Sequence, residues 1–81
     1  MKIDYTKQAR EALVSAPPAI QKALLKQVKF LATNLHHPSL RAKKYDEAQD
    51  IWQARITQDW RFYFKIQGDT YIIIRIIPHP K

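Results

Sequence analysis

Two arginines and a histidine near the end of the chain have side chains that could act together on a phosphodiester. Arg55 and Arg61 lie in consecutive strand-like segments, and His79 follows the next segment between two prolines. Guanidinium groups bind phosphate oxygens through paired hydrogen bonds and stabilise charge that develops on phosphorus. An imidazole transfers protons near neutral pH. The combination predicts RNA cleavage by transphosphorylation, in which the ribose 2′-OH attacks the adjacent phosphate and leaves a cyclic phosphate and a 5′-OH.

The same residues also have a purely structural interpretation. An arginine on the open face of an antiparallel sheet is usually a solvated cross-strand partner of a carboxylate, here Asp46, Glu47 or Asp50. A histidine between prolines at a chain terminus is more often part of a frayed tail than a catalyst. Tyr63 could stack on a base or simply cover the sheet. Spacing alone therefore favours the structural interpretation.

The composition is that of one small domain without metal or disulfide. The chain has 81 residues, 46% of them hydrophobic, which suffices for one core and predicts a single domain over residues 1–81. It has no cysteine, which excludes a disulfide framework and a cysteine-based zinc site. The adjacent His36 and His37 have no third ligand at metal spacing. We therefore expect no metal and no cofactor.

The charge of the chain indicates an anionic partner. The formal net charge is +7 and the isoelectric point is near 9.9, which suits nucleic acid, an acidic protein segment or an anionic membrane surface. The N-terminus has no apolar signal-peptide core, and no apolar run approaches the ~20 residues that span a bilayer. These features predict a cytoplasmic protein with no membrane association.

The first half of the chain should form a short strand and two helices. Residues 1–5 alternate like a strand, Asp4 or Thr6 can cap a helix over residues 7–13, and Pro17-Pro18 ends it. The second helix should end near Asn34. Its apolar stripe has three- and four-residue spacing and consists of Ile20, Leu24, Val28, Leu31 and Leu35.

Three lysines of the second helix fall largely off this stripe, and we expect them to form a solvated outer face. They are Lys22, Lys26 and Lys29. A polar connector over residues 39–50 follows and has room for a short strand at residues 41–45.

The last part of the chain should be an antiparallel meander. Strands are predicted at residues 51–57, 60–66 and 70–77, with turns at residues 57–59 and 67–69. Alternation separates an apolar face from an open face. The apolar face holds Trp60, Phe62, Phe64 and Ile66, and the open face holds Arg55, Arg61, Tyr63 and Lys65. If Arg75 lies on the open face of the last strand, alternation places His79 on the same face. The predicted fold class is α+β, with the helices packed on one face of a twisted sheet.

The segment from residue 51 to residue 64 resembles the signature of the RelE/ParE superfamily of toxins from type II toxin–antitoxin modules. It reads IWQARITQDWRFYF, and the preceding HPSLRAKK resembles the family's connector. The order of strand, two helices and meander is also the family's, so the similarity covers most of the chain. Pro78-His79 is more similar to the end of the RelE and YoeB-like ribonuclease branch than to the gyrase-poisoning ParE branch.

The resemblance implies roles for single residues. Arg61 matches the catalytic arginine that stabilises phosphate, and His79 matches the general acid or base. Arg55 matches a recurrent strand arginine with a binding or structural role. Lys43 and Lys44 lie where the family carries residues that contact RNA or the ribosome. We assign the same binding role to Arg41, Lys65 and Lys81, and name Glu47 and Tyr63 as auxiliary candidates.

As a whole, the resemblance implies a toxin that cleaves mRNA on the ribosome without a metal. A cognate antitoxin would neutralise it with a disordered acidic segment that folds over the basic cleft, and the complex would bind operator DNA through the antitoxin. Two alternatives stay open. One is a ParE-like inhibitor of DNA gyrase with no chemistry of its own, and the other is a non-catalytic relative that only binds antitoxin.

Overall fold

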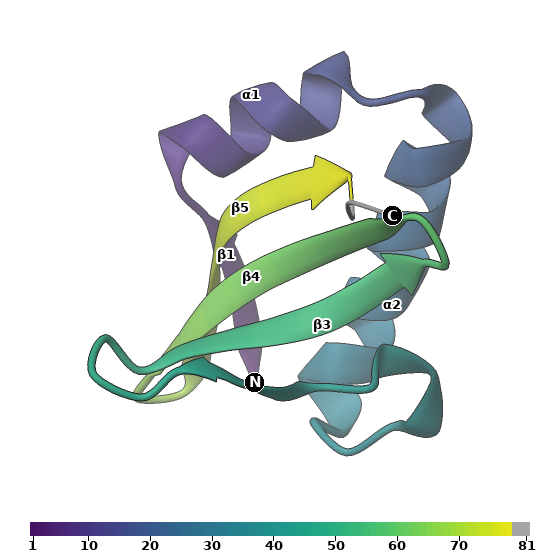
Figure 1. The fold of residues 1–81 in the computed structure, drawn as a ribbon. Helices are drawn as coiled ribbons and strands as arrows, with labels where there is room; N and C mark the ends of the chain where they lie inside the picture. Colours follow the sequence, from purple (N-terminus) through teal and green to yellow (C-terminus); the bar gives the residue numbers. More distant parts are fainter. Residues whose placement is uncertain (79–81) are drawn as a thin grey trace.

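Two helices cover one face of a five-stranded sheet in the computed structural model, which describes residues 1–78 (Figure 1). The predicted α+β class and order of elements are confirmed. Along the chain the elements are β1 (Lys2–Tyr5), α1 (Lys7–Ser15), α2 (Pro18–Thr33), the 3-10 turn η1 (Pro38–Leu40), β2 (Lys43–Asp46), β3 (Ile51–Thr57), β4 (Trp60–Gln67) and β5 (Thr70–Pro78).

Local sequence sets the ends of both helices. The hydroxyl oxygen of Thr6 accepts a hydrogen bond from the backbone N–H of Ala9 at 3.1 Å, so Thr6 is the N-cap of α1. Pro18 occupies the first turn of α2, where its missing N–H leaves no intrahelical bond unmade. Asn34 is the C-cap of α2, as predicted. Within residues 1–78, neither helix is long and apolar enough to cross a membrane.

The strand order in the sheet is β1-β5-β4-β3-β2. β3 to β5 form the predicted antiparallel meander, and β2, the short strand of the connector, extends it by pairing antiparallel with β3. β1 completes the sheet on the other side of β5, and this pair is parallel, with Lys2 opposite Thr70 and Tyr5 opposite Ile73. The first strand therefore lies beside the last one, as Figure 1 shows.

The core lies between α2 and the apolar face of the meander. Leu24, Val28 and Leu31 are buried, as the stripe predicts, and they belong to one cluster with Phe62 and Phe64. Both phenylalanines are fully buried. Ala9 joins this cluster from α1, so both helices contribute to a single core.

A β-bulge in β5 sets which of its side chains face the core. The register between β4 and β5 shifts between Tyr63 and Phe64, which leaves Ile74 without a cross-strand partner. Strict alternation from the buried Ile73 would turn Arg75 into the core. With the bulge, Ile73 and Ile76 are both buried, and Arg75 lies exposed opposite Tyr63. Arg75 therefore lies on the open face of the sheet, as assumed in the prediction for the last strand.

Candidate anion-binding site

Arg55 and Arg61 lie directly opposite each other on β3 and β4. Cross-strand partners share one face of a sheet, and like charges at this position repel. They line a cavity of about 240 Å³ together with Arg41 and Lys43, and no carboxylate of residues 1–78 contributes to its lining. We call this the cation cavity. Four cationic side chains around one cavity create a site that favours an anion.

No described carboxylate neutralises the two arginines. Asp50 pairs with Lys44, and a side-chain oxygen of Asp46 accepts a hydrogen bond from the backbone N–H of Gln49 at 3.1 Å. Within residues 1–78, neither arginine makes an ion pair. The structural interpretation, in which the arginines serve as cross-strand partners of these acids, is therefore wrong for the described part of the chain.

Arg61 has a second set of contacts that fixes its position. Its Nη1 donates to the carbonyl oxygens of Thr57, Trp60 and Gln58, at 2.7, 3.0 and 3.3 Å. One end of the half-buried guanidinium thus closes the turn between β3 and β4. Within residues 1–78, no acceptor uses the N–H groups of Nε and Nη2.

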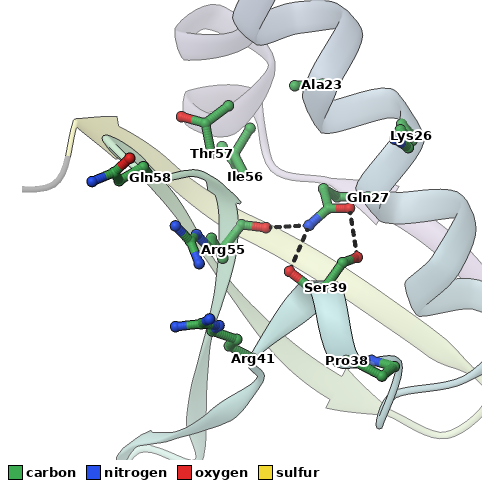
Figure 2. A pocket seen from close by; sticks show the side chains of 10 residues that line it. All are labelled: Ala23, Lys26, Gln27, Pro38, Ser39, Arg41, Arg55, Ile56, Thr57 and Gln58. Atoms are coloured by element: carbon green, nitrogen blue, oxygen red, sulfur yellow. Dashed lines mark hydrogen bonds between the residues drawn. The ribbon is translucent and has the colours of Figure 1, made fainter.

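Arg41 reaches the cavity through an uncommon backbone conformation. It follows η1 with φ 47° and ψ 43°, the left-handed region, in which a residue with a Cβ is strained by about 1–2 kcal/mol. Figure 2 shows its guanidinium extending to the same side as that of Arg55, away from α2. The strained turn therefore brings a cation from the connector next to a cation from the sheet.

A buried amide holds these segments together. Gln27 on α2 is only 6% exposed. Its Nε2 donates to the carbonyl oxygens of Arg55 at 2.7 Å and Ser39 at 3.0 Å, and its Oε1 accepts from the Ser39 hydroxyl at 3.1 Å (Figure 2). One side chain thus joins α2, η1 and β3. Gln27 was not among the predicted site residues, although its position three residues after Leu24 places it on the buried side of the helix.

Lys44 does not join the cation cavity. It donates a hydrogen bond to Asp50, which raises its pKa above the usual value, and its ammonium lies 5.1 Å from the centroid of the Trp52 ring. Successive residues of a strand point to opposite faces, so Lys43 and Lys44 cannot both line the cavity. Glu47, the auxiliary candidate in the hairpin after β2, does not line it either.

Two other predicted residues line a separate cavity of about 560 Å³. They are Tyr63 and Lys65, together with Tyr45 and Arg75 among others. The Tyr63 hydroxyl accepts a hydrogen bond from Gln53 at 2.9 Å. Because Gln53 also lines the cation cavity, the two cavities are neighbours along the open face.

The predicted residues His79 and Lys81 lie outside the described residues. The described part of β5 ends at Pro78, which pairs with Trp60, and Ile77 pairs with Arg61. The end of β5 therefore lies beside the strand position that carries Arg61. Among residues 1–78, no group of His, Cys, Asp or Glu could hold a metal ion.

The model of one protein family matches almost the whole chain. This family is described as the ParE toxin of type II toxin-antitoxin system, parDE, and the match covers residues 3–80. The chain belongs to this toxin family. The predicted membership of the RelE/ParE superfamily is thereby confirmed. No curated protein sequence matches the toxin.

Solved structures similar to the toxin share its fold at low identity. A YoeB/ParE toxin from Agrobacterium tumefaciens has a TM-score of 0.82 at 14% identity, with 99% of this chain and 100% of that chain covered. The archaeal RelE-RelB complex from Pyrococcus horikoshii gives 0.82 at 20% identity, covering 99% and 96%. A YoeB-YefM toxin-antitoxin complex from Staphylococcus aureus gives 0.79 at 15% identity, covering 99% and 98%.

Proposed function

We propose that the toxin is an endoribonuclease that cleaves mRNA on the ribosome without a metal ion. The observation that carries the proposal is the cation cavity, in which Arg41, Lys43, Arg55 and Arg61 surround one space with no described carboxylate in the lining. Such a cavity binds a phosphodiester in preference to a neutral substrate. The resemblance to RelE and YoeB-like toxins supports the same activity, and translation would stop because the message is cut.

The proposed chemistry is a transphosphorylation. The 2′-oxygen of one nucleotide forms a bond to the adjacent phosphorus while the bond from phosphorus to the 5′-oxygen breaks. The free N–H groups of Arg61 stabilise the additional negative charge on the phosphate oxygens. Arg55 and Arg41 hold the same phosphate through their guanidinium groups.

Two protons must also move. One leaves the attacking 2′-OH, and one reaches the departing 5′-oxygen. His79 is the residue that the family resemblance assigns to proton transfer, and its imidazole suits the task near neutral pH. Among residues 1–78, the lining of the cation cavity consists of arginines, a lysine, a glutamine and an alanine, so it includes no described imidazole or carboxylate.

We further propose that a cognate antitoxin neutralises the toxin. The Staphylococcus aureus structure with the same fold is a toxin-antitoxin complex, and the Pyrococcus horikoshii structure is a complex of RelE with RelB. An acidic segment of the antitoxin would lie over the cation cavity and exclude RNA from it. Operator DNA would be bound through the antitoxin.

Inhibition of DNA gyrase is the second candidate function. It is favoured by the family model, which is that of ParE, and by the contacts of Arg61 with the turn carbonyls, which give this arginine a structural role that needs no substrate. In that case the cation cavity would bind a protein surface and perform no chemistry.

One paired experiment separates these functions. After induction of the toxin in cells, new RNA 5′ ends should appear within translated messages, and plasmid supercoiling should be unchanged. The RNA fragments should carry a cyclic phosphate and a 5′-OH. Lost supercoiling without new RNA ends would favour gyrase. The matched variants are Arg55→Gln, which should abolish cleavage, and Lys29→Gln, which removes an exposed helix charge and should leave it intact.

A further inference from the structure

A larger cavity lies on the other side of Arg55, between α2 and β3. It has a volume of about 620 Å³. Among the described residues of its lining, Lys26, Arg41 and Arg55 are cationic and none is a carboxylate (Figure 2). We call this space the helix cleft. It is a second place where positive charge gathers without a described acid to neutralise it.

The helix cleft and the cation cavity have two lining residues in common. Arg41 and Arg55 line both. Because both residues belong to both linings, phosphates bound in the two cavities would be neighbours. Each guanidinium has several N–H donors in a planar fork, so it can serve two neighbouring phosphates at once.

The outer edge of β3 and the side chain of Gln27 form one wall of the helix cleft. β2 pairs with β3 only as far as Gln53, so within the described residues no strand covers the outer edge of β3 beyond that point. Gln27 takes the place of a strand there, because its Nε2 binds the Arg55 carbonyl and its amide also binds Ser39. The buried amide is thus the fixed wall of the helix cleft.

Lys26 distinguishes the helix cleft from the rest of α2. It is exposed, as are Lys22 and Lys29, but of these three lysines it alone lines the cleft. Its Nζ lies 6.0 Å from the centroid of the Phe30 ring, at the outer limit of a cation–π contact. Its ammonium therefore remains available to an anion. All three lysines are exposed, as predicted for a solvated face, and Lys26 lines the helix cleft in addition.

We infer that the helix cleft binds a second phosphate of a single-stranded polynucleotide, next to the phosphate held in the cation cavity. The inference rests on the proposed function, since it takes RNA as the ligand. Two adjoining sites with shared arginines fit a backbone that repeats one negative charge at every nucleotide. The fork of each guanidinium also matches phosphate oxygens. An acidic peptide also offers oxygen pairs to the guanidinium forks, but its charges do not repeat at a fixed interval, so it suits the pair of sites less well.

Binding of an uncleavable RNA tests the inference. The probe is a fluorescent 2′-O-methyl octanucleotide, which lacks the attacking 2′-OH and reports binding alone by anisotropy. Lys26→Gln should weaken binding by about 3- to 10-fold, as for the loss of one phosphate contact, and should reduce the slope of log K against log salt by about 0.7. The matched variants Lys22→Gln and Lys29→Gln remove the same charge from the same helix and should change affinity less than about 2-fold.

A shorter probe tests whether Lys26 acts at a second phosphate. A 2′-O-methyl dinucleoside monophosphate carries one phosphate and fills only the cation cavity. Its affinity should be the same for Lys26→Gln and for the unchanged toxin. An equal loss with both probes would place Lys26 at the first phosphate and overturn the inference. The inference would also be overturned if Lys26→Gln reduced affinity for the octanucleotide no more than Lys22→Gln does. Polyglutamate serves as an acidic peptide probe, and a loss of affinity in Lys26→Gln that appears only with polyglutamate would overturn the inference as well.

The outcomes separate this inference from the proposed function. If binding depends on Lys26 but no message is cut in cells, the second phosphate site stands and the endoribonuclease proposal fails. If messages are cut while binding is independent of Lys26, the endoribonuclease proposal stands and the second phosphate site fails. All three lysines are exposed, so the variants should fold, and their near-ultraviolet circular dichroism should match that of the unchanged toxin.

Discussion

Gln27 donates a hydrogen bond to the carbonyl oxygen of Arg55 across 2.7 Å and thereby ties the helix pair to the strand that carries the site. The same amide holds Ser39, two residues before Arg41. A single buried side chain therefore sets the spacing between the two arginines that line both cavities.

Replacing this amide should cost stability. Gln27→Met keeps the length of the side chain but leaves the carbonyl oxygens of Arg55 and Ser39 without their partner. Unsatisfied buried groups of this kind cost about 1–3 kcal/mol each, so the free energy of unfolding in urea should fall by at least that amount. The control Gln8→Met changes an exposed residue and should alter stability by less than about 0.5 kcal/mol. Equal effects in both variants would mean that the Gln27 contacts carry no net stability.

The core is tested by two neighbouring leucines of α2. Leu24 is fully buried and Leu25 is 50% exposed. Leu24→Ala should lower the free energy of unfolding by about 2–5 kcal/mol through lost burial and a residual cavity, a large fraction of the total for a domain of this size. Leu25→Ala should cost far less. A loss below about 1 kcal/mol for Leu24→Ala in denaturant melts would contradict the packing described for α2.

Arg61 has a structural and a proposed chemical role, and two substitutions separate them. Arg61→Ala should lower the rate of message cleavage by roughly 100-fold or more, because a charged contact to the transition state is lost. Arg61→Lys should recover only part of this rate, since an ammonium lacks the bidentate geometry. Loss of the turn contacts should lower the melting temperature of both variants. If both lose stability while cleavage persists, Arg61 serves only the turn.

Substitution of His79 should lower the cleavage rate without weakening binding. His79→Ala should reduce cleavage by about 100- to 10,000-fold, the usual range for a positioned acid or base, and should remove the pH dependence of the rate near neutrality. RNA and antitoxin binding should survive, which anisotropy and co-purification measure. A variant that cuts ribosome-bound messages as fast as the unchanged toxin would remove His79 from the mechanism.

Stability should decline at alkaline pH. Burial raises the pKa of Tyr5 above its ordinary value of 10.0, and the hydrogen bond with Asp50 raises the pKa of Lys44 above 10.5. In both cases the folded state favours the protonated form, so this stabilisation is complete below the unfolded pKa and is lost as pH rises through the folded pKa. Urea melts above about pH 10 should show the loss. Tyr5→Phe should flatten the decline, and an unchanged profile would exclude Tyr5 as a cause.

Local patterns predicted the facing arginines because strand alternation and a short turn are both local properties. Arg55 and Arg61 flank one turn, so their register follows from the hairpin itself. The same rule could have excluded Lys44, which is adjacent to Lys43 in one strand and must point the other way.

The rest of the site depends on contacts between distant segments. Arg41 lines the cavities because η1 folds against α2 and the backbone after it turns left-handed, which no local signal in an arginine predicts. Lys26 belongs to the helix cleft for the same reason, since its partners come from the connector and from β3. Helical periodicity separates buried from exposed positions, but it does not show which exposed positions another segment approaches.

The parallel pairing of β1 with β5 has a consequence for how the toxin is made. Tyr5 pairs with Ile73, so the sheet joins segments from nearly opposite ends of the described chain. Contacts of such long sequence separation form late and slow folding. A growing chain on the ribosome cannot complete the sheet until residue 73 has left the exit tunnel. The sheet therefore stays incomplete in any nascent chain that is interrupted before β5.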